Sequence, residues 1–235
     1  MYKGKTILAL IPARGGSKRI PGKNIKRLGT RPLIAWTIKA CKSSRFIDTI
    51  CVSSDDDKIL RISGSEGSDI LIKRPRSLAR DSSPRSACIL HAMEYFCKNK
   101  NERDYIILVQ PTSPFRTALH IDAAIEALLD NPKADSLASF RRVSVNPSWL
   151  FTRDRSGFTE KIFKRGVFGN KWKKMPLLWE YNGAIFIGKW NDVKKKGDFE
   201  SSRILLFEMD KYSSVDIDTE EDWRYAEILL KERQK

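Results

Sequence analysis

The stretch ILALIPARGGSKRIPGKN, residues 7–24, decides the fold. Its first five residues are all apolar, which predicts a buried β-strand. We interpret this apolar segment as a first strand and not as a signal peptide, because glycines and charges follow it instead of a small-residue cleavage site. The following turn contains an adjacent glycine pair and four cationic side chains, without a carboxylate: Arg14, Lys18, Arg19 and Lys23.

Apolar segments alternate with helix-like segments from this stretch to about residue 140. We expect strands over residues 6–12, 47–54, 68–74, 104–110 and 134–140, and helices over 31–44, 55–67, 83–99 and 118–132. Strands and helices in this order predict a three-layer, mostly parallel, Rossmann-like α/β sheet. The length is that of one such domain, so we expect a single domain over residues 1–235.

The pattern changes after residue 140. Residues 141–180 are rich in Arg, Lys, Trp and Phe and predict an irregular or hairpin-like insertion. Beyond it we expect strands over 182–188, 203–209 and 214–218, and a helix over 219–234.

The positive charge is unevenly distributed. The formal net charge is +15; residues 1–47 hold twelve Lys and Arg without an acid, and residues 161–176 hold six without an acid. Two such blocks predict a cleft for a polyanion, either a nucleoside triphosphate or a nucleic acid. A solvated basic face is the alternative interpretation.

Cysteine and histidine usage argues against a zinc site. The four cysteines, Cys41, Cys51, Cys88 and Cys97, form no C-x-x-C pair, and there are only two histidines, which we expect to be structural. Buried, reduced thiols are typical of a cytoplasmic protein. No apolar run approaches the roughly 18–20 residues of a membrane span.

The turn after the first strand has the chemistry of a phosphate site. In a parallel α/β sheet, ligands bind beyond the carboxyl ends of the strands. Gly15 and Gly16 allow backbone N–H groups to approach an anion, Arg14 offers a bidentate fork, and Lys18 and Lys23 add point charges. So many cations predict a triphosphate.

Two common phosphate motifs are excluded. A P-loop requires a glycine where Pro21 stands, and Asn24 replaces its Ser or Thr. The pattern G-x-G-x-x-G also fails, because Gly15 and Gly16 are adjacent.

Five blocks of the sequence resemble one family. The blocks are IPARGGSKRIPGKN (11–24), KRPRSLARDSS (73–83), VQPTSPFR (109–116), YNGAIFIG (181–188) and SVDIDTEEDW (214–223). In this order they resemble the acylneuraminate (sialic acid) cytidylyltransferases, whose members also act on related nonulosonic acids and are kin to the Kdo cytidylyltransferases. The resemblance implies a sheet of the nucleotide-diphospho-sugar transferase type and a homodimer, with residues 140–178 as a dimerisation insertion.

The resemblance also assigns residues to the two substrates. The implied nucleotide contacts are Arg14, Gly15, Gly16, Ser17, Lys18, Lys23, Asn24, Arg74 and Ser83. The implied sugar contacts are Gln110, Thr112, Ser113, Asn182 and Phe186. For Gln110 the pattern agrees, since its amide ends a buried strand at the edge where ligands bind.

Two aspartates near the carboxyl end predict a magnesium site. Asp216 and Asp218 alternate with Val215 and Ile217, so both carboxylates would leave one face of a strand and could hold Mg²⁺ together with phosphates. The alternative is a purely structural helix start, because Thr219 and a carboxylate three residues later form a capping-box pattern. An EF-hand is excluded, since Glu221 occupies its required glycine position.

Two positions depart from the family pattern. Pro84 and Arg85 stand where relatives often carry serine, and Trp172 stands where they usually carry an arginine for anionic substrate groups. Lys171 and Lys173 flank Trp172 but lack the bidentate fork, so neither is assigned that role.

The implied reaction is transfer of CMP from CTP to the anomeric hydroxyl of a sialic acid, an acidic nine-carbon sugar, with release of pyrophosphate. Arg14, Lys18, Lys23 and Asp218 would be the catalytic residues. The alternative acid sugars are Kdo, legionaminic acid and pseudaminic acid. A basic nucleic-acid-binding protein is a remote alternative, because the chain lacks a recognition helix and an aromatic RNA-binding signature.

Overall fold

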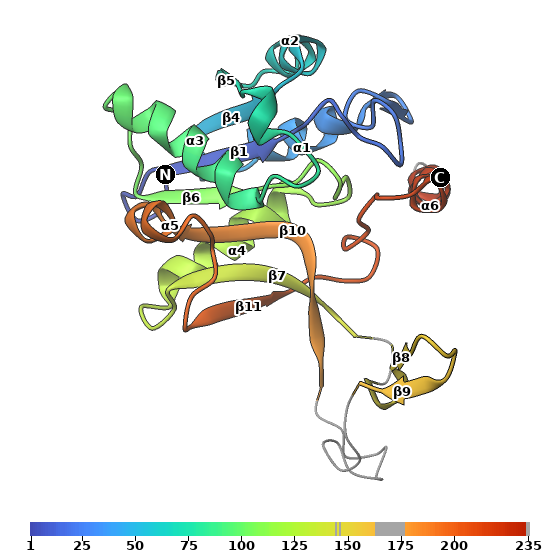
Figure 1. Cartoon of the computed structure of the whole chain (residues 1–235). Helices are drawn as coiled ribbons and strands as arrows, with labels where there is room; N and C mark the ends of the chain where they lie inside the picture. The colour runs from blue at the N-terminus through green and yellow to red at the C-terminus, as the bar shows by residue number, and fades with distance from the viewer. Residues whose placement is uncertain (144, 146, 163–176, 234–235) are drawn as a thin grey trace.

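The computed structural model describes residues 1–143, 145, 147–162 and 177–233. Its centre is a seven-stranded sheet in the order β11-β7-β10-β6-β1-β4-β5 (Figure 1). The strands are β1 (Ile7–Pro12), β4 (Thr49–Ser54), β5 (Ile70–Lys73), β6 (Tyr105–Leu108), β7 (Ser136–Arg142), β10 (Trp179–Lys189) and β11 (Ile204–Glu208). Only β10 runs against the other strands of this described sheet, so the predicted mostly parallel sheet is confirmed.

Helices cover both faces of the sheet and complete the three layers. One hydrophobic cluster includes side chains of α1 (Leu33–Lys42), α2 (Asp57–Ser65) and α4 (Ala118–Asp130). The cluster on the opposite face includes side chains of α3 (Arg85–Lys98) and α5 (Trp190–Lys196). None of the helices in the described residues is long and apolar enough to span a membrane.

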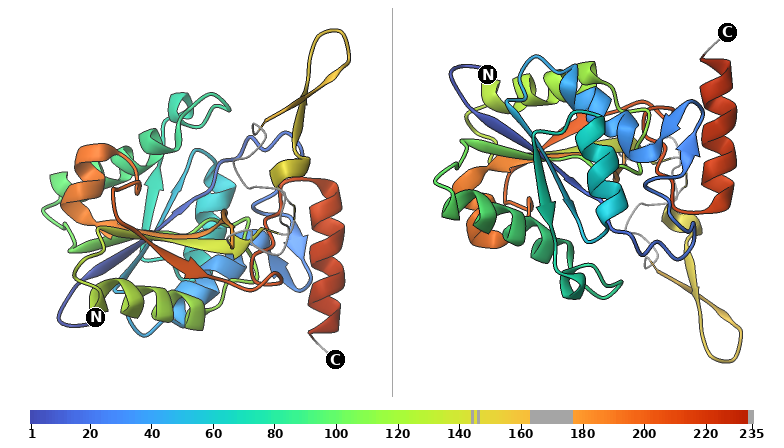
Figure 2. Two further views of the ribbon diagram at one scale, coloured as in Figure 1. Left: turned by 90° about the horizontal axis from the view of Figure 1, so that it is seen from below. Right: turned by 90° about the horizontal axis from the view of Figure 1, so that it is seen from above.

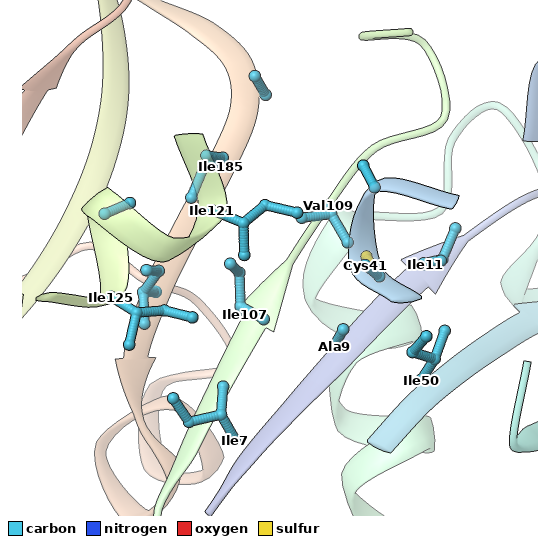
Figure 3. Close-up of a cluster of buried hydrophobic side chains, with 14 of the residues drawn as sticks. Ile7, Ala9, Ile11, Cys41, Ile50, Ile107, Val109, Ile121, Ile125 and Ile185 are labelled. Atoms are coloured by element: carbon cyan, nitrogen blue, oxygen red, sulfur yellow. The ribbon is translucent and has the colours of Figure 1, made fainter. Parts of the chain in front are cut away.

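Strand β1 lies at the centre of the sheet and is buried on both faces. Ile7, Ala9 and Ile11 pack into the first cluster, and Leu8 and Leu10 pack into the second. Figure 3 shows the first cluster, in which the residues of β1 lie near those of β4 and β6. This double burial explains why the strand is a continuous apolar run instead of an alternating one.

A third hydrophobic cluster joins the two ends of the chain. Ile20 and Leu33, which flank a small hairpin of β2 (Arg27–Leu28) and β3 (Arg31–Pro32), pack with Ile217 and with Trp223 of α6 (Glu220–Glu232). The segment after the basic turn is therefore held against the segment that carries the two aspartates.

The predicted insertion contains a hairpin, β8 (Phe151–Arg153) with β9 (Thr159–Lys161), preceded by the 3-10 turn η2 (Pro147–Trp149). The hairpin projects away from the layers of the domain (Figures 1 and 2). Residues 163–176 of the same insertion, including Lys171, Trp172 and Lys173, lie outside the described residues.

One expectation about elements was wrong, and one helix was missed. Residues 214–218 do not form a strand: Val215 and Ile217 are buried against α6 in the third cluster, so burial alone produces their alternation with the aspartates. Helix α5 was not expected. It is only seven residues long and ends at Gly197, whose φ of 71° lies in the left-handed region that favours glycine.

Candidate active site

Two neighbouring cavities open at the carboxyl ends of the central strands. The first has a volume of about 340 Å³ and is lined by the basic turn, by the loop of residues 74–85 and by Asp218. The second, of about 270 Å³, is lined by β10, by residues 198–200 and by Asp216. Arg85 and Gln110 line both cavities, so the two share a border.

The basic turn already holds an anion of the protein itself. The Arg14 guanidinium and the Lys18 ammonium each lie 2.7 Å from a carboxylate oxygen of Asp81. Hydrogen bonds from Lys18 and then from Arg14 hold the pKa of Asp81 below its usual range. Two cations of the turn therefore converge on one oxyanion, as phosphate binding requires.

Lys23 connects the basic turn to the aspartates near the carboxyl end. Its Nζ donates to the Asp218 carboxylate at 3.0 Å and to the Ile217 carbonyl at 2.7 Å, and only 11% of the side chain is exposed. A guanidinium nitrogen of Arg19 lies 3.7 Å from the other Asp218 oxygen. The two groups, which lie almost 200 residues apart in sequence, thus meet at one cavity, to which Lys23 and Asp218 both contribute.

The glycines of the turn have different roles. The Gly15 N–H donates to the Asp55 carboxylate at 3.0 Å, and a Cβ at Gly15 would lie 2.9 Å from Asp56. Gly15 therefore makes room for Asp56, which caps α2. Nothing lies within 4 Å of a Cβ built on Gly16.

The other implied nucleotide residues gather around the first cavity. Ser17, Asn24, Arg74 and Ser83 all line it. Asn24 is buried and its amide donates to the Arg14 carbonyl at 2.9 Å, which fixes the turn. The Ser83 hydroxyl donates to the Ser77 carbonyl at 3.0 Å, which closes the opposite loop.

The implied sugar residues divide between the two cavities. Asn182 and Phe186 line the second cavity, Thr112 lines the first, and Gln110 lines both. Ser113 is fully buried and belongs to neither set of lining residues, so the structure does not bring it to the site.

The Asn182 side chain is held by the protein. Its Oδ1 accepts from Ser139 Oγ and from the Ala184 N–H, and its Nδ2 donates to Ser214 Oγ at 2.9 Å. The next residue is Gly183, with φ of 73°. A Cβ there would lie 3.7 Å from the Gln110 amide nitrogen and 3.8 Å from an Asp216 carboxylate oxygen, so both of these groups lie close to Gly183.

Asp216 has the character of a cation ligand. Its Oδ1 is buried without a hydrogen-bond partner among the described residues, and burial raises the pKa of the carboxyl, with Asp218 adding to the rise. A buried oxygen of this kind and the half-exposed Asp218 suit a hard divalent cation that completes its shell with phosphate oxygens and water. In the described residues no group of three or more His, Cys, Asp or Glu is positioned to hold a metal by itself.

The expected helix start is confirmed and positions Asp218. Thr219 and Asp222 form a capping box at the start of α6. The Asp222 carboxylate accepts from the backbone N–H of Asp218 at 3.0 Å. The capping box therefore serves both as a structural cap and as a support for the carboxylate that pairs with Lys23.

Arg116 is a buried arginine that connects the backbone of Gln110, at the border of the cavities, with the backbone of β10. It is 2% exposed, and its Nη1 donates to the carbonyls of Gln110 and Ala184 at 3.1 and 3.0 Å. Burial lowers its pKa to about 10. The sequence identified Arg116 only as a further cation, because nothing in the pattern distinguishes a buried arginine from an exposed one.

Several lining residues were missed. Asp81 is one, and Tyr181, Asp198 and Glu200 line the second cavity without having been singled out. Arg85 was noted only as a departure from the family pattern, and that departure was the available signal. Both histidines were expected to be structural. This is confirmed for His120, because its side chain completes the capping box at the start of α4.

Comparisons with known proteins agree on the family. A family model described as cytidylyltransferase matches residues 8–171. The CMP-N,N′-diacetyllegionaminic acid synthase of Legionella pneumophila is 32% identical over 232 residues, covering 97% of this chain and 98% of that one. The N-acylneuraminate cytidylyltransferase of Escherichia coli O18:K1:H7 is 34% identical over 233 residues, covering 97% of this chain and 54% of that one, so the chain spans about half its length.

A solved structure agrees on the fold. The CMP:2-keto-3-deoxy-manno-octonic acid synthetase complexed with CTP has a TM-score of 0.71 and 14% identity, and the alignment covers 97% of this chain and 99% of that one. Because the sequence identity is this low, the similarity is evidence for a shared fold alone.

Proposed function

The chain belongs to the cytidylyltransferase family, and from this we propose that it transfers CMP from CTP to the anomeric hydroxyl of a sialic (N-acylneuraminic) acid, releasing pyrophosphate. The observation that carries the proposal is the meeting of Lys23 and Asp218 at a cavity that borders a second one. Legionaminic acid is the principal alternative sugar, since the Legionella relative has almost the same length. Pseudaminic acid and Kdo are further alternatives.

We assign the first cavity to CTP. Arg14, Lys18 and Lys23 would hold the triphosphate, with Ser17, Gly16 and the N–H groups of the turn around it. Arg74, Ser83 and the loop that carries them would hold the base and ribose. The Asp81 carboxylate, which pairs with Arg14 and Lys18, would have to yield these cations to the phosphates.

We assign the second cavity to the sugar. Gln110 and Asn182 would face its hydroxyl and amide groups, and Phe186 would pack against the ring. The 2-hydroxyl would then attack the α-phosphorus as the bond to the β-phosphate oxygen breaks. The cations of the turn stabilise the departing pyrophosphate, and the borders of the cavities fix the two reactants in line.

Asp216 and Asp218 are the residues that would hold Mg²⁺, since Asp216 offers an oxygen without a hydrogen-bond partner in the described part of the chain and Asp218 lines the first cavity. When bound, the ion would neutralise phosphate charge and increase the acidity of the attacking hydroxyl. Lys23 now occupies one oxygen of Asp218, and it would share that carboxylate or turn to the phosphates.

Nucleic-acid binding is less well supported. Lys18 and Arg14 pair with Asp81, Lys23 and Arg19 pair with Asp218, and Lys26 pairs with Glu220. These pairs bring three carboxylates of the chain to five of its cations, so they offset part of the basic block that prompted the idea. A cytoplasmic location fits the four cysteines, all of them free and three of them buried.

We also infer a homodimer. The hairpin of the insertion carries exposed apolar side chains, including Phe151 and Phe158, on a segment that projects from the domain. Large exposed apolar groups that project in this way favour a protein interface.

The test measures the release of pyrophosphate from CTP in the presence of Mg²⁺. Four sugars are assayed separately: N-acetylneuraminic acid, N,N′-diacetyllegionaminic acid, pseudaminic acid and Kdo. We expect turnover with N-acetylneuraminic acid, abolished in Asp218→Ala. Glu220→Gln is the matched control, because this neighbouring carboxylate is exposed and lines neither cavity. Turnover with none of the four sugars overturns the function, and near-normal turnover in Asp218→Ala overturns the metal assignment.

A further inference from the structure

The border between the two cavities is a defined place with few residues. Of the described lining residues, only Arg85 and Gln110 belong to both cavities. Gln110 is neutral, so Arg85 supplies the only side-chain charge at this border.

The chemistry of an acid sugar makes that border important. In a 2-keto sugar acid, the carboxylate and the hydroxyl that attacks phosphorus are attached to the same carbon. When the hydroxyl faces the α-phosphate in the first cavity, the carboxylate must lie at the border as well. It then meets the negative charge of the phosphate, and repulsion at this range is costly unless a cation lies between them.

The second cavity offers few cations for this task. Its described charged residues are the carboxylates Asp198, Glu200 and Asp216, and a single cation, Arg85. A sugar with a negative charge would be repelled by three of these groups and attracted by one.

The Arg85 guanidinium is held in place but not fully used. Its Nη2 donates to Asp198 at 2.8 Å, and its central carbon lies 4.6 Å from the centre of the Phe186 ring. The side chain is 37% exposed. A guanidinium has five N–H donors in one plane, so donors remain for a second carboxylate after the bridge to Asp198.

We propose that Arg85 binds the carboxylate of the acid sugar and so selects acid sugars over neutral ones, with Asp198 and Phe186 positioning its fork. The proposal rests on the proposed function. It gives a role to a residue at which this chain departs from the family pattern, in a cavity that lacks another described cation.

The test compares Arg85→Ala, Arg85→Lys and Arg203→Ala. Arg203 pairs with Asp135 at 2.9 Å in the same manner as Arg85 pairs with Asp198, but it lines neither cavity. Two ligands are used: the acid sugar that wild type uses best among the four above, as substrate, and its C1 carboxamide, as a competitive inhibitor.

In Arg85→Ala we expect kcat/KM for the acid sugar to fall about 10-fold or more, mostly through KM, as for loss of a charge-assisted bidentate contact. The inhibition constant of the carboxamide should change less than about 3-fold, since it carries no charge. The kcat/KM of Arg85→Lys for the acid sugar should fall between the values of wild type and Arg85→Ala. The kcat/KM of Arg203→Ala should resemble that of wild type.

An unchanged KM for the acid sugar in Arg85→Ala overturns the proposal. So does an equal loss for the acid and the carboxamide, which would indicate a steric role. Both results leave the function of the wild-type enzyme intact. Wild type that turns over none of the acid sugars removes the proposed function itself, and this proposal with it.

Discussion

Lys23 has the most constrained environment of the cations on the basic turn. It is almost buried, and its ammonium lies between a backbone carbonyl and the Asp218 carboxylate. Lys18, by contrast, is 82% exposed. A cation with little access to water interacts more strongly with a phosphate than an exposed one, because the local dielectric is lower.

We therefore predict that Lys23→Met raises the KM for CTP by about 10-fold or more, with a much smaller change for the sugar. Lys26→Met is the control, since Lys26 lies just beyond the same turn but pairs with Glu220 and lines neither cavity. Initial rates with each substrate varied in turn measure both constants. Equal effects of Lys23→Met on the two substrates would contradict the placement of Lys23 at the phosphates.

For single residues, the sequence predicted those features that follow from the position of the basic turn. A basic turn after the first strand must lie at the edge where ligands bind, so the position of Arg14 and Lys23 at the first cavity could be predicted. Asp81 and Arg85 could not be foreseen, because their contacts depend on how the loop of residues 74–85 folds back over the turn. The burial of Arg116 and Ser113 likewise depends on tertiary packing.

Helix α6 links stability to the site through its first turn. The Thr219 hydroxyl bonds with the Asp222 carboxylate at 2.8 Å and accepts from the Asp222 N–H. The same carboxylate holds the backbone of Asp218. A change in this cap should thus alter both the helix and the carboxylate in the first cavity.

We predict that Thr219→Ala lowers the free energy of unfolding by about 1 kcal/mol, the usual cost of a lost N-cap. The kcat should fall as well, because Asp218 loses part of its support. Thr219→Ser keeps the hydroxyl and should restore both quantities. Urea unfolding and steady-state rates provide the measurements; an activity loss that serine does not restore would argue against the cap as its cause.

Asp104 fastens the starts of two central strands. Its carboxylate accepts from the Thr6 N–H and hydroxyl at 2.9 Å and from Lys5 at 2.9 Å, just before β1 and β6 begin. These bonds hold the pKa of Asp104 below its usual range, and the bond from the Thr6 N–H contributes most to this. A lowered carboxyl pKa contributes stability above the pKa of the unfolded chain, and the contribution is lost as the pH falls through the folded-state pKa.

Asp104→Ala should therefore be less stable than wild type by about 1–2 kcal/mol at pH 7, a value reduced for the partial exposure of the group. The difference should shrink below about pH 4, where the Asp104 carboxyl takes up a proton more readily in the unfolded chain than in the folded protein. Urea unfolding of both proteins across this range measures it. A difference independent of pH would mean that the carboxylate charge is not its source.

The elements themselves were predictable where one physical signal acts alone. Strands β1, β4 and β6 are buried and largely apolar, since both faces of the central sheet are covered. Residues 214–218 show the opposite case, because their alternating pattern results from burial against α6 and not from pairing with another strand. The reversed direction of β10 also left no trace in the sequence, because side-chain alternation is the same in either direction.

The whole molecule combines a three-layer domain with a hairpin whose Phe151 and Phe158 are exposed in the described part of the chain. Phe158 is 73% exposed and lies in the turn of the hairpin, between β8 and β9. A two-stranded hairpin is marginally stable by itself in water. In the proposed homodimer, a second copy of the chain would cover this apolar surface, and residues of about 140–178 would reach the partner's site.

We predict that wild type has twice the 27.0 kDa mass of the chain in solution and that Phe158→Asp shifts it toward the single-chain mass. The exposed phenylalanine contributes little to the monomer, so the melting temperature of the domain should change little, while kcat/KM falls with the loss of dimer. Leu119→Asp is the control: Leu119 is 76% exposed, and the first turn of α4 tolerates an acid. Light scattering at the assay concentration, run beside the pyrophosphate assay, distinguishes the outcomes. A single-chain mass for active wild type would show that the hairpin has another use, because the site would then be complete within one chain.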